Sequence, residues 1–277
     1  MVTKLPFDFA VFRYNANGTL DASFGTGGIV ADSQGYASGV LVQPDSKIVV
    51  IGGLGNSQTG IVRYNADGSL DAAFGTGGKT ITPVPAGFFD VALQPDGKIV
   101  VSGSGIDSDP NSNADYLLLR YNSNGSLDST FGVGGYVITD IAASGDDVAY
   151  GGVALQPDGK ILVNGSSGIV RYNTNGSIDT GFAVNGIFRA DGDISWDIAL
   201  QPDGKIVAVG GLGEFSLTRL NADGSADTSF GTNGNVITLI GGGGNVLALQ
   251  PDGKILSGGR LSPYRHAEVV IVRYSGE

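Results

Sequence analysis

Apolar residues occur along the chain in short runs rich in Val, Ile and Leu, separated by turn phrases rich in Gly, Pro, Asn and Asp. Residues 88–140 form one complete unit. Its segments "DVALQ" and "KIVVSG" are joined by "PDG", where Pro presets φ and Gly accepts a positive φ, so we expect a tight hairpin. "DYLLLRYN" then leads through an Asn-Gly turn to "GGYVITD". The pattern predicts four short antiparallel strands, A to D in chain order.

Two phrases recur at a regular distance along the chain. "RYNANGTLDASFG" begins at Arg13, with close copies at Arg63, Arg120, Arg171 and Arg219 and a shortened "RYSGE" at Arg273. Successive copies lie 48 to 57 residues apart, and phrases of the type "QPDGKI" lie between them. A period of about 50 residues with four strands per repeat is typical of a β-propeller. We therefore predict an all-β β-propeller of five four-stranded antiparallel blades, with a six- or seven-bladed ring or an open array as alternatives.

The two phrases resemble those of the delta-60 repeat family, a bacterial β-propeller repeat whose units carry "RYNxDGSLDxxFG" and "ALQPDGKIVV". The resemblance covers nearly the whole chain, with local departures such as Ser46 in place of Gly. It implies the fold far more than an activity, and it carries over no catalytic residue. Because the family occurs mainly in long, surface-associated bacterial proteins, the resemblance implies an extracellular or cell-surface location.

The repeats predict a single domain over residues 1–277 with an uneven number of strands. The chain begins with a C and D pair in residues 7–32, continues with four complete sets, and ends with strands A, B and C. We expect the N-terminal strands to complete the last blade, as in rings that close through their termini. One C-type strand is then surplus. We expect that it lies outside the ring, that it pairs with another molecule, or that the chain is an excerpt from a longer array with more blades.

The repeated residues have structural explanations. In each of the first five copies of the phrase, an Asp follows the Arg by eight positions, which predicts an Arg–Asp pair across the turn or an Asp cap. The Leu and Phe of the same phrase, such as Leu20 with Phe24 and Leu70 with Phe74, are expected to pack between blades. An active site would not be built five times over, so we assign the phrase to the scaffold.

The net charge of −11 excludes the basic surface that binding to nucleic acid requires. No apolar run approaches the length of a membrane span, and the N-terminus as given has no signal peptide. With one His and no Cys, a zinc site or a Ser-His-Asp triad has little support.

A polar insertion, "DSDPNSNAD", carries alternating oxygen-bearing side chains that suit Ca²⁺. It is similar to the calcium loops of integrin-type propellers, which would make Asp107, Asp109, Asn111 and Asp115 the ligands. A Ser stands where those loops have their Gly, so an ordinary solvated loop is the alternative.

Carboxylates outside the repeat are the candidates for catalysis. Asp90 and Asp197 each lie four residues before the Gln of a "QPD" phrase, where strand A enters the central channel of a propeller. An acid and base pair drawn from Asp90, Asp197, Asp147 or Asp193 would suit a glycoside hydrolase, and a solvated channel rim is the simpler interpretation. Trp196 could stack on a sugar or fill the core.

These patterns favour a non-enzymatic structural or interaction module of a bacterial surface or secreted protein. A lectin-like carbohydrate-binding propeller and a five-bladed carbohydrate-active hydrolase are the alternatives. The partner, a protein or a glycan, is not specified by the sequence.

Overall fold

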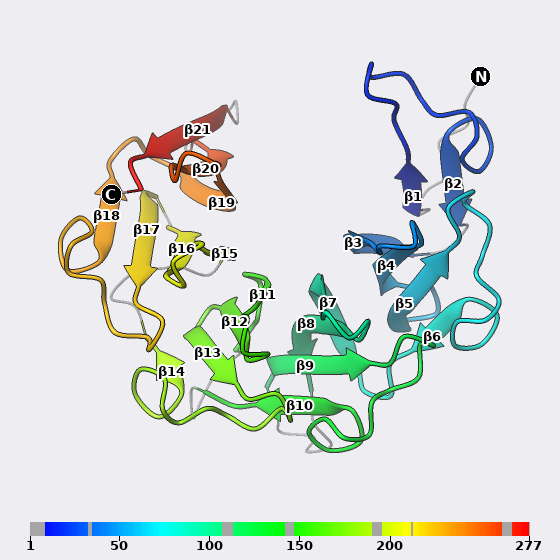
Figure 1. Ribbon diagram of the computed structural model, residues 1–277, viewed down its shortest axis with the longest axis horizontal. Helices are drawn as coiled ribbons and strands as arrows, with labels where there is room; N and C mark the ends of the chain where they lie inside the picture. Colours follow the sequence, from blue (N-terminus) through cyan, green and yellow to red (C-terminus); the bar gives the residue numbers. More distant parts are fainter. Residues whose placement is uncertain are drawn as a thin grey trace. The chain divides into compact units, whose positions relative to one another are not determined.

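The computed structural model describes residues 9–32, 35–106, 113–141, 147–189, 196–211, 213–261 and 268–276. Its elements are β-strands joined by turns (Figure 1), and within these ranges there is no helix long and apolar enough to span a membrane. The chain divides into two compact units, each treated by itself. Unit 1 comprises residues 1–112 and 117–138, and unit 2 comprises residues 113–116 and 139–277.

Four sheets have four strands each, in the order A, B, C, D. They are β3 (Tyr36–Val42), β4 (Ile48–Gly53), β5 (Thr59–Tyr64) and β6 (Lys79–Ile81); β7 (Ala86–Leu93), β8 (Ile99–Gly105), β9 (Asp115–Tyr121) and β10 (Tyr136–Thr139); β11 (Val153–Leu155), β12 (Ile161–Gly165), β13 (Gly168–Tyr172) and β14 (Ile187–Phe188); and β15 (Asp197–Leu200), β16 (Ile206–Gly210), β17 (Phe215–Leu220) and β18 (Asn235–Thr238). The predicted order of strands within a repeat is confirmed.

Two smaller sheets flank these in sequence. β1 (Phe9–Phe12) pairs with β2 (Ile29–Asp32), and β19 (Gly243–Leu249), β20 (Ile255–Arg260) and β21 (Val269–Tyr274) form a three-stranded sheet. These are the expected C–D pair and A–B–C set. The β-propeller fold with about five to six blades follows from these repeated antiparallel sheets, whereas completion of the last blade by residues 7–32 stays a prediction.

The repeated turns take the conformations that their residues favour. In the turn between β7 and β8, the amide of Gln94 donates to the carbonyl of Lys98 at 2.8 Å, and Gly97 has a φ of +83°. In the Asn-Gly turn after β9, the amide of Gly125 donates to the carbonyl of Asn122 at 2.9 Å, and the φ of Gly125 is +87°. Both turns allow adjacent strands to reverse within a few residues.

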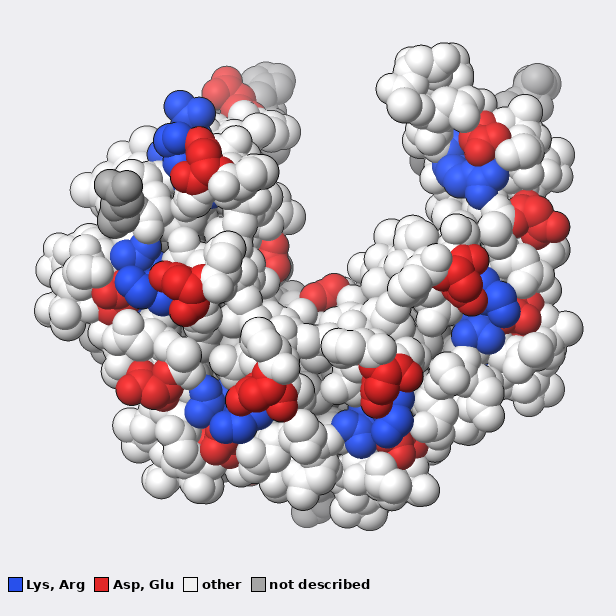
Figure 2. All heavy atoms as spheres, in the orientation of Figure 1, with Lys and Arg blue, Asp and Glu red and all other residues white. Residues whose placement is uncertain are grey.

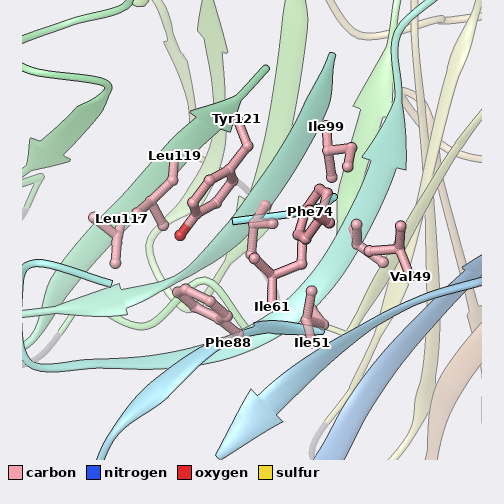
Figure 3. Close-up of a cluster of buried hydrophobic side chains, with 11 residues drawn as sticks. Val49, Ile51, Ile61, Phe74, Phe88, Ile99, Leu117, Leu119 and Tyr121 are labelled. Atoms are coloured by element: carbon pink, nitrogen blue, oxygen red, sulfur yellow. The ribbon is translucent and has the colours of Figure 1, made fainter. Parts of the chain in front are cut away.

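Apolar side chains from successive sheets interlock to form the core. In unit 1, Phe74 from the turn after β5 packs with Ile61, Phe88, Ile99 and Tyr121, as Figure 3 shows. The repeated Phe residues are almost completely buried in every copy, at 0% exposure for Phe24, Phe74, Phe131 and Phe182 and 3% for Phe230. The prediction that they pack in the core is confirmed.

The corresponding prediction for the repeated Leu is wrong in the first two copies, whereas in the third Leu127 is partly buried and packs against the core of unit 1. Leu20 and Leu70 are 38% and 43% exposed. Each lies against the last Gly of the "GTGG" turn, close enough that a Cβ at Gly78 would lie 3.1 Å from Leu70. In these first two copies the Leu therefore covers its own turn rather than filling the space between sheets.

Candidate functional site

The repeated Arg, Asp and Lys form an ionic cluster in each full sheet. Arg63 Nε donates to Asp71 Oδ2 at 2.7 Å, and Lys47 Nζ lies 2.9 Å from the same oxygen. The other Asp oxygen caps the next turn, as the amide of Ala73 donates to Asp71 Oδ1 at 3.2 Å. The pairs Arg120–Asp128, Arg171–Asp179 and Arg219–Asp227 repeat the Arg–Asp distance of 2.7 Å. The Arg–Asp pair and the Asp cap, expected as alternatives, occur together.

The same Arg also joins its sheet to the following one. Arg63 Nη1 donates to the backbone carbonyl of Ser123 at 2.6 Å, and its guanidinium lies 4.3 Å from the ring centroid of Phe74. In unit 2, Arg171 Nη1 donates to the carbonyl of Ala222 at 2.6 Å. We call the Arg, its Asp, the Lys and the carbonyl of the next sheet the inter-sheet latch. Figure 2 shows Lys and Arg lying beside acidic side chains in separate clusters rather than in one basic patch.

The latch holds its carboxylates ionised. The hydrogen bond from Lys205 is the largest cause of a lowered pKa for Asp227, followed by the hydrogen bond from Ser229. The pKa of Asp71 is lowered chiefly by the hydrogen bond from Lys47. A carboxyl with a depressed folded-state pKa stabilises the fold above its unfolded pKa, and this contribution is lost as the pH falls through the folded-state pKa. The Asp side chains of the latch are therefore ionised groups that stabilise the fold.

A different set of acids gathers in unit 2, outside the repeat pattern. Asp115 begins β9, Asp140 follows β10, and Asp147 precedes β11. One carboxylate oxygen from each lies within 4.8 Å of the other two. Asp115 and Asp147 are 5% and 0% exposed, whereas Asp140 is exposed. Three carboxylates so close repel one another unless a proton or a cation lies among them.

Asp147 is held firmly in this acidic cluster. The amide of Ile141 donates to Asp147 Oδ2 at 2.7 Å, and the hydroxyl of Ser167 donates to Oδ1. The amide of Asp147 donates to the carbonyl of Ala114 at 2.6 Å, which ties the segment before β11 to the start of β9. These bonds fix the carboxylate before any ligand arrives.

Tyr116 is buried beside the acidic cluster. Its hydroxyl donates to the carbonyl of Gly168 at 2.9 Å and accepts from the amide of Ser167 at 3.1 Å. Burial raises the pKa of Tyr116, so its hydroxyl stays protonated. The cluster thus combines hard oxygen donors with a neighbouring tyrosine whose buried hydroxyl is already hydrogen-bonded. Such a donor set can hold Ca²⁺, Mg²⁺ or Mn²⁺, and it lacks the His and Cys ligands typical of zinc.

The predicted calcium ligands are represented here by one residue. Asp107, Asp109 and Asn111 lie outside the described residues. Asp115 is buried at the start of β9, where it joins Asp140 and Asp147. Sequence reasoning treated Asp147 as a catalytic candidate and did not single out Asp140. All three acids lie outside the repeated phrases, so their departure from the pattern was the available signal.

Asp90 and Asp197 occupy corresponding positions in different units. In each, Oδ1 accepts the amide of the next residue at 2.8 Å, from Val91 in β7 and from Ile198 in β15. Asp197 Oδ2 also accepts the amide of Leu247 in β19 at 2.7 Å. Both oxygens of Asp197 thus join backbone segments, which favours a structural part for this carboxylate. Asp193 lies outside the described residues.

Trp196 stacks on another aromatic side chain. Its ring lies 5.7 Å from that of Tyr150, with an angle of 25° between the planes. A cavity of ≈ 210 Å³ beside it is lined by Trp196, Asn245, Arg260 and several glycines. A larger open groove of ≈ 790 Å³, also in unit 2, is lined by residues including Phe188, Arg189 and Asp223.

The chain was compared with known proteins. A family model described as a β-propeller domain of unknown function (DUF5122) matches residues 6–24, 43–74, 94–131, 156–182 and 201–230, which together exceed half of the chain. This match agrees with the expected bacterial β-propeller repeat. No match is found among curated protein sequences.

Solved structures with similar folds include several propellers. A gluconolactonase from Xanthomonas campestris is 15% identical with a TM-score of 0.48, over 83% of this chain and 72% of that chain. An ulvan lyase of polysaccharide lyase family PL25 is 13% identical with a TM-score of 0.46, over 96% and 74%. A xylan β-1,4-xylosidase from Bacillus halodurans is 12% identical with a TM-score of 0.37, over 85% and 52%.

Proposed function

Because the chain belongs to the DUF5122 family of β-propeller domains, whose function is unknown, we propose that it is a non-enzymatic structural and interaction module. One observation carries the proposal, namely that the repeated ionisable residues are engaged in the inter-sheet latch. Arg63, Lys47 and Asp71 bind one another and the next sheet, and the same arrangement recurs along the chain. A fold reinforced in this way suits a protein that presents surfaces rather than one that transforms a substrate. A bacterial surface or secreted assembly is the setting that the sequence resemblance favours.

A test of this proposal uses purified protein with lactones, aryl glycosides and uronate-containing polysaccharides, with and without divalent cations. We expect no turnover above that of the Asp90→Asn and Asp197→Asn variants. Turnover by the wild type that either variant abolishes would overturn the proposal in favour of a carbohydrate-active hydrolase. Circular dichroism of both variants shows whether a loss of turnover reflects a loss of fold.

The acidic cluster adds a cation site to this module, and we assign Ca²⁺ as its occupant. Asp115, Asp140 and Asp147 supply three hard oxygen donors, and the large Ca²⁺ ion accepts irregular oxygen geometry more readily than Mg²⁺ does. The amide of Ile141 and the hydroxyl of Ser167 position one donor in advance. The ion would join the ends of β9 and β10 to the segment before β11, so its part is structural.

Carbohydrate binding is the second candidate function, and one observation favours it. Trp196 and Tyr150 form an aromatic surface, and Trp196 borders a small cavity that also presents the polar side chains of Asn245 and Arg260. Apolar faces of sugars pack on such rings while hydroxyls bind polar groups. A glycan array should then show binding that Trp196→Ala abolishes, and an array without any bound glycan would exclude this candidate.

A further inference from the structure

The cavity beside Trp196 is built by two neighbouring repeats of unit 2, from side chains that break the repeat. Trp196 lies immediately before β15, and Asn245 lies in β19. Each precedes the Gln of a "QPD" phrase by five positions, so the two residues are equivalents in successive repeats. The other repeats have Ser38, Phe89 and Gly151 at this position. The cavity therefore combines an aromatic and an amide side chain that its neighbours in sequence lack.

Arg260 adds a charge to the same cavity. It ends β20, six positions after the Lys of its "QPD" phrase. The equivalent residues of the other repeats are Gly53, Ser104, Ser166 and Gly211. Among the described residues that line the cavity, Arg260 is the one ionisable residue. The site thus carries a positive charge at a position that is uncharged in every other repeat.

The strands hold the backbone of these three residues in place. The amide of Trp196 donates to the carbonyl of Val209 in β16 at 3.1 Å, and Arg260 pairs with Gly243 in β19. The register of β19 against β20 shifts at Asn245, which makes Asn245 the extra residue of a β-bulge. A bulge re-aims a side chain, and bulges are over-represented beside binding and active sites.

The floor of the cavity is backbone, because its glycines have no room for side chains. Gly242 has a φ of +96°, and a Cβ there would overlap the carbonyl of Arg260. A Cβ at Gly243 would overlap the carbonyl of Gly211. The volume of ≈ 210 Å³ is smaller than the roughly 300–1,000 Å³ of pockets that take drug-sized ligands, so the cavity suits a single sugar ring.

The polar groups around the cavity are available to a ligand. Within the described ranges, the structure shows no side-chain hydrogen bond for Trp196, Asn245 or Arg260, and no ion pair for Arg260. The indole of Trp196 is oriented by its stack on Tyr150. The cavity therefore offers an aromatic ring, an amide and a guanidinium, and its charge favours an anionic ligand.

We propose that this cavity binds a uronate residue of an acidic glycan. The indole of Trp196 would pack on the apolar face of the sugar ring, and Arg260 would donate two parallel hydrogen bonds to the carboxylate. The amide of Asn245 would bind ring hydroxyls. The positive charge selects an acidic sugar over a neutral one. This inference rests on the carbohydrate-binding candidate above and names its ligand class.

Tryptophan fluorescence tests the site directly, because Trp196 is the only tryptophan of the chain. The probes are the methyl glycosides of glucuronic acid and galacturonic acid. At least one of these uronides should change the emission in a saturable way. Its methyl ester keeps the sugar ring without the charge, and it should bind at least about tenfold more weakly.

Substitutions of Arg260 separate the charge from the rest of the cavity. Arg260→Gln removes the charge from an exposed side chain, so the fold should be kept, as circular dichroism can verify. It should weaken uronide binding at least about tenfold, to the level of the methyl ester. Arg260→Lys retains the charge and should keep a preference for the uronide, although it loses the planar fork. Arg273→Gln, at an exposed arginine of β21 outside the cavity lining, should leave binding unchanged.

The outcomes separate this inference from the function on which it rests. Equal binding of the uronide and its methyl ester overturns the acidic ligand and leaves carbohydrate binding standing. Uronide affinity that Arg260→Gln leaves unchanged also overturns it. Unchanged emission with both uronides, together with no heat in calorimetric titrations, overturns the site itself. The glycan array then decides independently whether the chain binds carbohydrate at all.

Discussion

At the scale of single residues, Ser46 shows how the repeat constrains conformation. It occupies the turn position that Gly holds in the other "QPD" phrases, and its φ of +65° lies in the left-handed region. A residue with a Cβ is strained there, whereas Gly is not. We predict that Ser46→Gly raises the free energy of unfolding by about 0.5–1 kcal/mol. Urea denaturation monitored by circular dichroism measures the change.

The matched control is the reverse substitution in the next repeat. Gly97 has a φ of +83°, and a Cβ there would meet no atom closer than 3.8 Å, so the backbone conformation alone is tested. Gly97→Ser should destabilise by about 1 kcal/mol. Equal stability of both variants and the wild type would show that these turns relax without cost.

At the scale of elements, strand order and turn type could be predicted from the sequence because both are local. Alternating apolar runs and the residues Pro, Asp, Asn and Gly dictate them within a few positions. The Lys of the latch was missed, since Lys98 and Asp128 come together, 3.0 Å apart, only after β8 and β9 pair. The acidic cluster was missed for the same reason, as Asp115, Asp140 and Asp147 belong to separate segments.

The acidic cluster yields a prediction at this scale, because a bound cation would fasten three segments together. Calcium at about 100 times its Kd would add about 2.7 kcal/mol to the stability of the folded state. Millimolar CaCl₂ should therefore raise the melting temperature above that in chelator. Asp140→Asn, at an exposed ligand position, should abolish this rise.

Glu268→Gln is the control for that experiment, as Glu268 is an exposed acid outside the cluster. Its melting curves should respond to calcium as those of the wild type do. Coincident curves of the wild type in calcium and in chelator would contradict the calcium site.

At the scale of the whole molecule, the repeat period predicted the β-propeller fold, and the family match and the sheets agree with it. The function, by contrast, could not be predicted from the repeat period. Residues that break the repeat, Trp196 and Asp147 among them, carry no period from which their neighbours could be inferred. Their surroundings became visible only when the strands were placed.

The central claim is that the repeated charges hold neighbouring sheets together, and two pairs with the same spacing allow a direct test. Arg63 and Asp71 are each 8% exposed at the side chain, whereas Arg13 and Asp21 are 33% and 25% exposed. Loss of one partner from a buried pair leaves an uncompensated charge, while an exposed pair contributes little.

The decisive measurement is the free energy of unfolding in urea for Asp71→Asn and Asp21→Asn against the wild type. The latch predicts a loss of about 3 kcal/mol for Asp71→Asn and a much smaller loss for Asp21→Asn. If Asp71→Asn unfolds at the same urea concentration as the wild type, the repeated charges do not hold the sheets together, and their recurrence requires another explanation.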